Sequence, residues 1–379
     1  MKFEEFVSGS YKQQYQYQSF LPASINQVWS WDDPRINVLL EQATKSLGEL
    51  NAFTLIVPDV DLFIHMHIIK EANTSSRIEG TRTEMDEAVL EEEAILPERR
   101  DDWREVQNYV RAMNTAIGEL KTLPLSLRLL RHTHEILMGG VRGERKTPGE
   151  FRRSQNWIGG ASLADAAFIP PHHADMAELL TDLEAFWHND NVAVPQLVRC
   201  ALSHYQFETI HPFPDGNGRI GRLLITLYLV SHGLLNKSSL YLSAHLEKHR
   251  GAYYDALTRV RESNDIGHWV RFFLQAVVET AESGKTTFQR ILALRQELDA
   301  EVVKMGRRAV NAQQLILHLY GTPTITVNKA MEVLGIKYVP ANSLIATLVD
   351  MGVLQEVTGF QRNRIFILRR YIDIFRDGN

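Results

Sequence analysis

Residues 209–222 read TIHPFPDGNGRIGR and lie directly before an apolar run, LLITLYLV, at 223–230. Proline and glycine interrupt regular structure, so the quoted stretch is expected to form a loop, and the apolar run behind it is expected to form a helix. The preceding residues, 195–209, also follow a helical pattern. The stretch therefore predicts two helices, 195–209 and 217–232, joined by a loop that ends where the second helix begins.

The loop places several anion-binding groups at the start of the second helix. Gly216, Asn217 and Gly218 lie at its N-terminus, where unpaired N–H groups and the helix dipole attract an anion, and glycine lets that anion approach the backbone. Arg219 and Arg222 are three residues apart, so they share one helical face and can add charge-assisted hydrogen bonds. Two arginines at a helix end suit a polyphosphate better than a carboxylate. The predicted nucleotide-binding residues of this segment are Gly216, Asn217, Gly218, Arg219, Ile220, Gly221 and Arg222.

Two side chains of the same loop are suited to phosphate chemistry. Asp215 offers oxygen ligands of the kind that Mg²⁺ takes when it bridges phosphate groups. His211 has an unperturbed pKa near physiological pH, so it can accept a proton from an incoming hydroxyl. These groups predict general-base attack on a nucleotide phosphate, with Mg²⁺ and the helix end stabilising charge. A plain tight turn would not need His, Asp, Asn and two Arg together, so we favour the catalytic interpretation.

The composition excludes several classes of protein for the chain as a whole. With 379 residues and a net charge of -5, the chain is long enough for two or three domains and is not a general binder of nucleic acid or anionic membranes. The single cysteine, Cys200, excludes an intramolecular disulfide and a thiolate zinc cluster, and its apolar surroundings predict a buried side chain. No signal-peptide pattern and no membrane-length apolar run occur, so we expect a cytoplasmic protein.

Hydrophobic periodicity predicts a mostly α protein with four regions along the chain. These are an N-terminal helical extension at 1–100 with a helix at 59–80, a helical core at 101–283, a connecting helix at 284–305 and a C-terminal domain at 306–379. The other helices predicted before residue 284 are 34–50, 101–120, 125–138, 174–189, 195–209, 217–232, 248–261 and 266–281. In the C-terminal region three short helices precede two strands, which is the order of a winged helix-turn-helix domain.

One small β-hairpin is predicted beside the helical core. A glycine-rich, basic loop at 141–160 leads into WIGGASLADAAFIPP, 157–171, which has two short extended pieces around a polar tip. A hairpin that stands beside a helical bundle has a free edge. Such an edge can accept an extended peptide as an added strand.

The loop sequence HPFPDGNGR, 211–219, resembles the signature of the Fic family at every defined position, and Arg222 matches the second arginine of its extended form. The resemblance covers roughly residues 20–285 and includes GEFRRSQNWIGG, FIPP and YYDAL. Fic proteins transfer AMP from ATP to a hydroxyl side chain of a target protein. The resemblance therefore implies ATP as substrate, Mg²⁺ as cofactor, and Ser, Thr or Tyr residues of proteins as acceptors, with the protein itself as one candidate target.

Carried over by position, the resemblance implies a role for each motif residue. His211 would be the base, Asp215 the Mg²⁺ ligand and Phe213 the anchor of the loop in the core. Arg219 and Arg222 would bind the terminal phosphates. The phosphate-transferring relatives have Lys at position 218, so the glycine here favours AMP transfer. The hairpin would be the family's flap, whose target-docking residues are Leu163, Ala164, Asp165, Ala166, Ala167 and Phe168.

A second motif, SSRIEG at 75–80, ends the predicted helix 59–80. Ser75 and Glu79 are four residues apart and share a face, and a carboxylate in the last helical turn faces the negative end of the dipole. On the residues alone, an exposed glutamate that tolerates this position is the favoured interpretation. The stretch also resembles the inhibitory motif of many Fic proteins. That resemblance implies that Glu79 pairs with Arg222 and takes the place of the terminal phosphate.

Other candidate residues carry weaker signals. Three histidine pairs lack the four-residue spacing of a helical zinc site, and no HExxH pattern occurs, so we expect structural roles for them. These pairs are His65 with His67, His132 with His134, and His172 with His173. Tyr253 and Tyr254 are neighbours in a helix and face different ways, so one is expected in the core. Tyr254 is the residue we assign to nucleotide binding.

The C-terminal domain has two interpretations. Its candidate recognition helix, 340–351, has no Lys or Arg and few polar side chains for base edges, which argues against direct readout of DNA. We favour a protein-interaction or homodimerising module. Two alternatives to AMP transfer stay open: another phosphate transfer from the same site, and a nucleotide-sensing transcriptional regulator that binds DNA through the winged helix.

Overall fold

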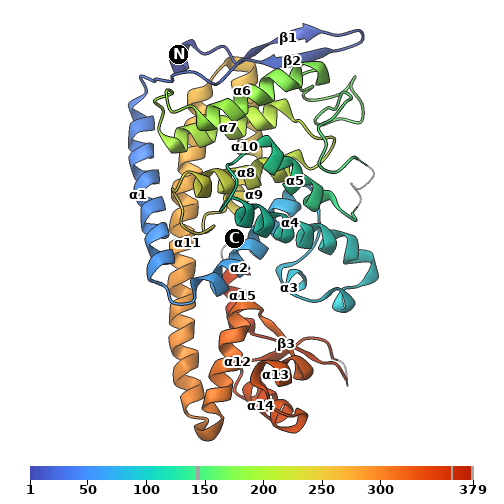
Figure 1. Ribbon diagram of the computed structural model, residues 1–379, viewed down its shortest axis with the longest axis vertical. Helices are drawn as coiled ribbons and strands as arrows, with labels where there is room; N and C mark the ends of the chain where they lie inside the picture. Colours follow the sequence, from blue (N-terminus) through green and yellow to red (C-terminus); the bar gives the residue numbers. More distant parts are fainter. Residues whose placement is uncertain (142–145, 360–361, 377–379) are drawn as a thin grey trace.

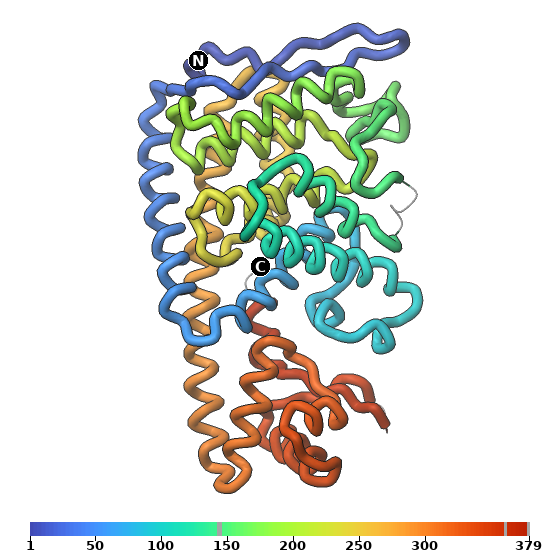
Figure 2. Tube along the Cα trace, viewed as in Figure 1, coloured from blue at the N-terminus to red at the C-terminus, as the bar shows by residue number. Residues whose placement is uncertain are grey.

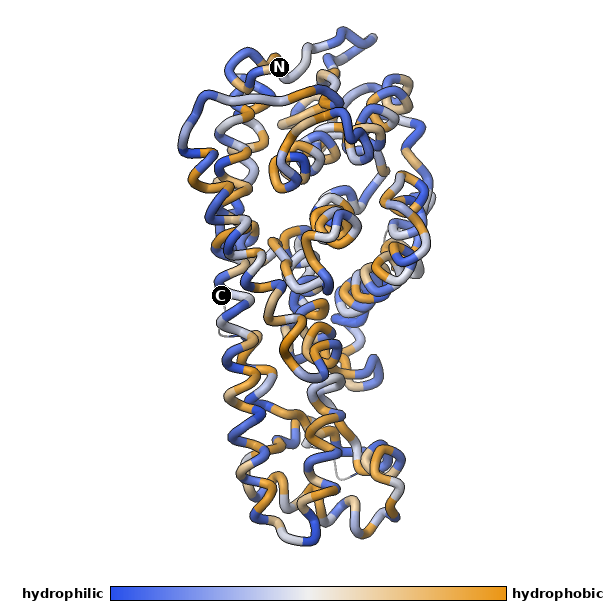
Figure 3. The backbone as a smooth tube through the Cα atoms, turned by 60° about the vertical axis from the view of Figure 1, so that its left-hand side comes forward, coloured by the Kyte–Doolittle hydropathy of each residue, from blue (hydrophilic) through white to orange (hydrophobic). Residues whose placement is uncertain are grey.

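The structure is a computed structural model that describes residues 1–141, 146–359 and 362–376. It is mostly helical, as predicted. Figure 1 shows a large helical body with a smaller C-terminal part below it, and the long helix α11 (Ile266–Val303) extends along both. Figure 3 shows hydrophobic and hydrophilic residues alternating along the helices, in keeping with helices that bury one face. Within the described residues, no helix is long and apolar enough to cross a membrane.

The helices of the body follow one another along the chain, and the long connection between α5 and α6 carries the flap. Their bounds are α1 Pro34–Ile56, α2 Val60–Ile78, α3 Met85–Ala88, α4 Arg100–Glu119, α5 Leu127–Met138, α6 Met176–His188, α7 Gln196–Ile210, α8 Asn217–Ser231, α9 Ser243–Lys248 and α10 Arg250–Ser263. Short 3-10 helices occupy Phe3–Glu5, Glu92–Ala94, Pro97–Arg99, His173–Asp175 and Gly306–Arg308. Most predicted helices are present within two or three residues of the expected bounds. The exceptions are α1, which extends six residues beyond the predicted end at residue 50, and the region around residue 283.

The centre of the body is formed by α7 and α8. Nearly every residue of α8 is buried, which is what a helix that is apolar on most sides requires. Helix α7 packs on α8, and α11 is fixed to α7 by Trp269, whose Nε1 donates to the carbonyl of Ala201 at 2.8 Å. Cys200 on α7 is buried, as predicted. The loop between α7 and α8 is therefore held at the ends of two buried helices.

The predicted connecting helix 284–305 is not a separate element. Residues 266–303 form one uninterrupted helix, so the break expected near residue 283 is wrong. Helix α1 packs along α11, and Leu50 Cδ1 would lie 3.1 Å from a Cβ at Gly284, so the glycine admits a close neighbour and does not end the helix. The helix predicted at 248–261 begins instead at Arg250. A short separate helix, α9, precedes it.

The N-terminal residues form a β-ribbon that the sequence analysis did not predict. Strands β1 (Gly9–Gln13) and β2 (Gln18–Pro22) pair antiparallel with Gly9 opposite Pro22. The ribbon lies at the top of Figure 1, and Figure 2 traces it from the N-terminus. Its β2 strand contacts the flap, because Phe20 N donates to Ile169 O at 2.9 Å.

The expected flap hairpin is present only as one antiparallel bridge, between Ile158 and Phe168. Gly159 and Gly160 have φ values of 69° and 73°, a left-handed conformation that ends an extended strand. The tip is a turn in which Asp165 accepts hydrogen bonds from two backbone N–H groups, at 2.7 and 2.8 Å. The edge is not wholly free, since Ile169 already pairs with β2. Residues 142–145 of the basic loop lie outside the described residues.

The C-terminal part contains α12 Ala309–Gly321, β3 Thr324–Thr326, α13 Val327–Leu334, α14 Tyr338–Asp350, β4 Gln355–Glu356, β5 Ile365–Ile367 and α15 Arg369–Arg376. The sheet is antiparallel with the order β3-β5-β4. The three predicted helices precede the two predicted strands, and this order is consistent with a winged helix. Strand β3 and helix α15 were not predicted. The additional helix, α15, returns to α2 in the body although the two lie about 300 residues apart in the chain (Figure 2).

Candidate active site

The conformation of the loop between α7 and α8 is fixed by two left-handed residues and by the side chain of Asn217. His211 ends α7 with a φ of 51°, and Gly216 stands before α8 with a φ of 73°. Asn217 spans the loop: its Oδ1 accepts from Phe213 N and its Nδ2 donates to Phe213 O, both at 2.7 Å. The Asn217 amide is therefore used within the loop. The backbone N–H groups at the start of α8 are the groups left to face a ligand.

Phe213 anchors the loop in the core, as the resemblance implies. Its side chain is fully buried and stacks on the His134 ring at 3.9 Å between centroids. His134 is itself held at both ring nitrogens, since its Nδ1 accepts from Gly149 N at 2.9 Å and its Nε2 lies 3.0 Å from Asp215 O. One member of the His132 and His134 pair thus has the structural role that was predicted for it.

Two residues of the preceding segment fix the backbone at His211. Arg152 is buried, and its Nε donates to His211 O at 3.0 Å. Asn156 Nδ2 donates to His211 O at 3.2 Å and to Phe213 O at 3.1 Å. Neither residue was assigned a role from the sequence. Their only signal was the segment GEFRRSQNWIGG, which contains both and forms part of the resemblance.

The His211 imidazole lies at the rim of this loop and is 19% exposed. Burial lowers its pKa to about 4, with a smaller opposing effect from Glu208 O, which lies 3.4 Å from Nδ1. The side chain is therefore neutral at physiological pH. A neutral imidazole can accept a proton.

Both arginines of the motif have carboxylate partners from other helices. Arg222 Nη2 lies 2.7 Å from Glu79 Oε1, and Arg219 Nη1 lies 3.0 Å from Glu105 Oε2. Ser75 adds two contacts, because its Oγ accepts from Arg222 Nε and its carbonyl accepts from Arg222 Nη2, each at 2.9 Å. The contact of Glu79 with Arg222 that the resemblance implies is thus present, and the contacts of Ser75 with Arg222 are additional to it. Glu105 was not singled out from the sequence.

The Glu79 carboxylate stands over the first turn of α8. A Cβ at Gly218 would lie 2.4 Å from Glu79 Oε1 and 3.0 Å from Arg222 Nη1. Burial raises the pKa of Glu79, but the Arg222 guanidinium outweighs this effect, and the pKa lies below its usual value. Glu79 is therefore an anion placed where the helix N-terminus and Arg222 attract negative charge.

Asp215 faces the same space. Its Oδ2 is 2.9 Å from Lys146 Nζ, and its Oδ1 accepts from Gly216 N at 2.7 Å. Burial raises the pKa of Asp215, while Lys146 lowers it, and the net shift is downward. A cavity of about 260 Å³ brings the predicted metal and phosphate residues together with the predicted inhibitory one. It is lined by Glu79, Gly80, Thr81, Glu105, Val141, Asp215, Gly216 and Arg219.

Glu208 is a buried carboxyl group near His211 that the sequence analysis did not identify. Its Oε2 lies 3.9 Å from His211 Nδ1, and burial raises its pKa to about 7 despite the opposing charge of Arg222. It fits beneath α8 because position 221 is a glycine, where a Cβ would lie 2.1 Å from Glu208 Oε1. The signal in the sequence was its place three residues before His211.

The two neighbouring tyrosines divide as predicted. Tyr253 is buried, and its hydroxyl lies 2.9 Å from His204 Nε2. Tyr254 is 39% exposed, and burial and the Glu79 charge both raise the pKa of its phenol. The Arg250 guanidinium lies 5.8 Å from its ring centroid. Tyr254 is thus the one of the two that is available to a ligand.

The flap residues 163–168 lie beside the β-ribbon. Phe168 is their buried member, with the Arg261 guanidinium 3.9 Å from its ring centroid and the Phe20 ring at 5.9 Å. The Asp165 carboxylate accepts hydrogen bonds within the tip of the flap. The hydrogen bonds from Ser162 and from backbone N–H groups lower its pKa to about 2. The flap base is therefore fixed to the body through Phe168.

Comparison with protein families gives two matches. The family described as Fic/DOC family N-terminal matches residues 38–118, and the Fic/DOC family matches residues 124–229. The curated Protein adenylyltransferase Fic of Culex quinquefasciatus is 33% identical over 160 residues, which is 42% of this chain and 29% of that protein. The protein of the same name from Drosophila grimshawi is 26% identical over 262 residues, 68% of this chain and 50% of that protein. The matched part of the chain thus spans half or less of the length of these relatives.

Among the solved structures that resemble this one, two share its fold over most of their own length. A Fic family protein from Desulfovibrio desulfuricans G20 superimposes with a TM-score of 0.56 and 20% identity, and the match covers 89% of this chain and 96% of that chain. A Fic domain containing signaling protein from Bacteroides thetaiotaomicron VPI-5482 gives a TM-score of 0.52 and 19% identity, covering 67% and 97%. At these identities the likeness establishes the fold.

Proposed function

We propose that the protein transfers AMP from ATP to a hydroxyl side chain of a target protein, because residues 38–118 and 124–229 match the two Fic/DOC family descriptions and the similar curated proteins are named protein adenylyltransferases. The observation that carries this proposal is the meeting of a neutral imidazole, a carboxylate and two buried arginines at the start of α8. These groups are His211, Asp215, Arg219 and Arg222. They would provide a base, a metal ligand and a polyphosphate site within residues 211–222.

The polyphosphate of ATP would bind the N–H groups at the start of α8 and the two arginines. Asp215 would hold Mg²⁺, which supplies positive charge to the phosphates when it is bound. Two observations support this assignment: the Asp215 carboxylate already lies against a cation, Lys146, and it opens on the 260 Å³ cavity. Tyr254 is proposed to contact the nucleoside.

The proposed reaction is a substitution at the α-phosphorus of ATP. The target hydroxyl oxygen forms a bond to this phosphorus, the bond from phosphorus to the bridging oxygen breaks, and pyrophosphate leaves. His211 takes the hydroxyl proton. Its pKa of about 4 belongs to the protein without nucleotide. The negative charge of a bound polyphosphate would raise that pKa toward the range where an imidazole is an effective general base.

We further propose that Glu79 restrains this reaction. Its carboxylate is an anion paired with Arg222, so it competes with the terminal phosphate for the same guanidinium. Removing the side chain at residue 79 would take the carboxylate partner away from Arg222 and leave the His211 and Asp215 side chains in the chain. The restraint therefore predicts that the protein as isolated is largely inactive and that Glu79→Gly raises AMP transfer.

The proposal is tested with ATP labelled at either the α or the γ phosphate. Wild-type protein, Glu79→Gly and Glu79→Gly combined with His211→Ala are incubated with each label and Mg²⁺, alone and with candidate target proteins. We expect label on protein only from the α position, more with Glu79→Gly than with wild type, and none with His211→Ala. Glu93→Gly, at an exposed glutamate remote from the loop in sequence, is the matched control and should behave as wild type.

Other outcomes separate the alternatives. Label retained only from the γ position would identify a kinase and contradict AMP transfer. Equal activity of wild type and Glu79→Gly would contradict restraint by Glu79 while leaving AMP transfer intact. No label from either position, together with salt-sensitive DNA binding, would favour the nucleotide-sensing regulator.

The remaining assignments extend this proposal. We propose that residues 1–100 form the inhibitory extension, 101–283 the Fic domain and 306–379 a winged-helix domain, with the lower half of α11 joining the last two. A target segment would dock on the flap at 163–168, and the protein itself is one candidate target. A homodimer through the C-terminal domain and a cytoplasmic location also stay predictions.

A further inference from the structure

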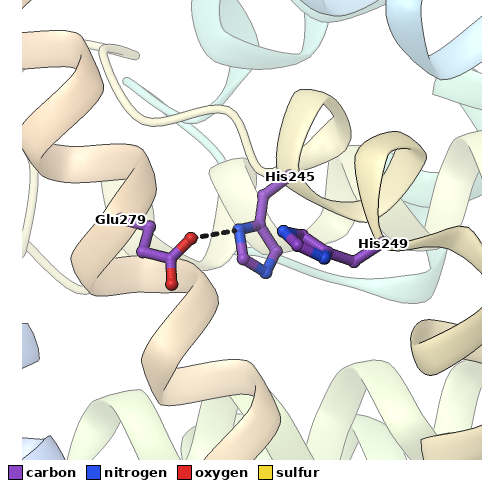
Figure 4. A group of neighbouring side chains, drawn as sticks. All are labelled: His245, His249 and Glu279. Atoms are coloured by element: carbon purple, nitrogen blue, oxygen red, sulfur yellow. Dashed lines mark ion pairs between the residues drawn. The ribbon is translucent and has the colours of Figure 1, made fainter. Parts of the chain in front are cut away.

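Three side chains outside the loop between α7 and α8 form a cluster with metal-binding chemistry. They are His245 on α9, His249 at the end of α9, and Glu279 on α11. One ligand atom from each lies within 4.8 Å of the others, and Figure 4 shows the three side chains pointing toward one another. We propose that His245, His249 and Glu279 bind a zinc ion.

The spacing of the ligand atoms suits a tetrahedral ion. Ligands about 2.0–2.2 Å from zinc lie about 3.4 Å apart in a tetrahedron. His245 Nδ1 is 3.2 Å from Glu279 Oε2, which is already close to that separation. The ring centroids of the two histidines are 4.5 Å apart, so a small movement of the side chains brings the third ligand into range.

The local fold places both imidazoles on one side. His245 and His249 are four residues apart, and His249 N donates to His245 O at 3.0 Å, so the helical turn between them is intact although α9 ends at Lys248. Side chains four residues apart on a helix are neighbours. This spacing distinguishes the pair from the three histidine pairs discounted from the sequence. The Glu279 carboxylate comes from the middle of α11, so a metal ion bound here would join α9 to α11.

The carboxylate is also oriented by a neighbour. Gln275 Nε2 donates to Glu279 Oε1 at 2.8 Å, which leaves Oε2 directed at His245. The His245 ring is 9% exposed and packs edge-on against Phe272 at 5.9 Å, so its orientation is fixed. Metal ligands in proteins are typically oriented by neighbouring groups of this kind. The contacts of Gln275 with Glu279 and of Phe272 with His245 therefore fit a metal site.

The ligand set indicates the class of ion. Two imidazole nitrogens and one carboxylate suit zinc, and three protein ligands leave a fourth position for water or another ligand. His245 and Glu279 line a cavity of about 470 Å³ behind α2, whose wall also carries Lys70, Arg77 and Lys248. The ion would fasten α9 to α11 beside the Arg77–Glu247 contact of 3.5 Å, which joins α9 to α2.

The test is metal binding by the full chain after removal of metal with a chelator and without nucleotide. Titration with Zn²⁺ in competition with a chromophoric chelator should show one tight equivalent in wild-type protein. Titration with Co²⁺ should give the intense visible absorption of a four-coordinate site. Absence of a tight equivalent from wild-type protein would overturn the proposal.

Matched variants locate the site. His249→Ala and Glu279→Gln should each abolish the tight equivalent, and Gln275→Ala should weaken it about tenfold while keeping one equivalent. His132→Ala is the control, because His132 also faces a glutamate, with Nδ1 2.9 Å from Glu119 Oε1, and it should bind as wild type. Glu279 is exposed, so its variant is expected to fold even if His249→Ala does not. Unchanged affinity of Glu279→Gln for Zn²⁺ would contradict the assignment. The contact between His245 and Glu279 would then be an ion pair or hydrogen bond without a metal.

Discussion

Gly221 and Glu208 face each other across the contact between α7 and α8. A Cβ at position 221 would lie 2.1 Å from Glu208 Oε1 and 3.1 Å from its Cδ. Both residues are buried, so the carboxyl group has little room to move aside. We therefore expect Gly221→Ala to lower the free energy of unfolding by roughly 1–3 kcal/mol, the usual cost of overpacking a core. Urea denaturation measures this difference.

Two further variants control that measurement. Gly48 lies inside α1 with no atom within 4 Å of a Cβ, so Gly48→Ala should stabilise the protein by about 0.4–1 kcal/mol. In a Glu208→Ala background the penalty of Gly221→Ala should largely disappear, because the clashing atoms are absent. An undiminished penalty in that background would show that a different contact makes glycine necessary.

At the same scale, candidate site residues could be named from the sequence where they are contiguous. His211, Asp215 and Arg222 could be assigned because one loop and one helix start contain them all. Arg152, Glu105 and Glu208 could not, since their roles depend on which helices pack together. Periodicity does not encode that packing. The Glu79–Arg222 contact was reached through the family resemblance, because the two residues are 143 positions apart.

Among the elements, helices with a regular apolar pattern were predicted well and the β-ribbon was missed. The strand Gly9–Gln13 is almost wholly exposed, so it lacks the alternation of apolar and polar residues by which a half-buried strand is recognised. The length of α11 was also missed. Ser283 and Gly284 are poor helix formers, but packing of α1 along this helix overrides their weak propensity.

Helix α15 gives a prediction about the joining of the C-terminal part to the body. Phe375 is 2% exposed and its ring lies 5.1 Å from the His67 ring of α2, so the aromatic side chain is buried against the proposed inhibitory helix. Phe375→Ala should lower the free energy of unfolding by roughly 3–5 kcal/mol. Arg376→Ala is the matched control, because its ion pair with Asp86, at 3.7 Å, is half exposed and should contribute at most about 1 kcal/mol. Equal effects of the two variants in urea would show that α15 does not dock on α2 in solution.

The whole molecule buries several histidines whose charged form it disfavours. Burial lowers the pKa of His67 to about 3 and those of His134, His204 and His211 to about 4. Burial acts in the opposite direction on carboxyl groups, and it raises the pKa of Glu208 to about 7. Between about pH 4.5 and 6.5 the unfolded chain therefore takes up protons on these four histidines while the folded chain retains one on Glu208.

The pH dependence of stability follows from this balance of protons. A histidine whose pKa is lower in the folded state contributes stability above about pH 6.5 that is lost as the pH falls toward 4, whereas Glu208 contributes in the reverse sense. Since the histidines outnumber Glu208, the free energy of unfolding should decrease as the pH falls from 7 to 5.

His67 packs between Phe288 and Phe375, so a phenylalanine is a suitable replacement for it. His67→Phe should remove one of the protons that the unfolded chain takes up, and it should reduce the slope of the free energy of unfolding against pH by about 1.4 kcal/mol per pH unit. Urea denaturation at constant ionic strength measures the slope, with Gly48→Ala as a control that shifts the curve and keeps its shape. An equal slope in wild type and His67→Phe would mean that His67 is not held neutral by burial in the folded state.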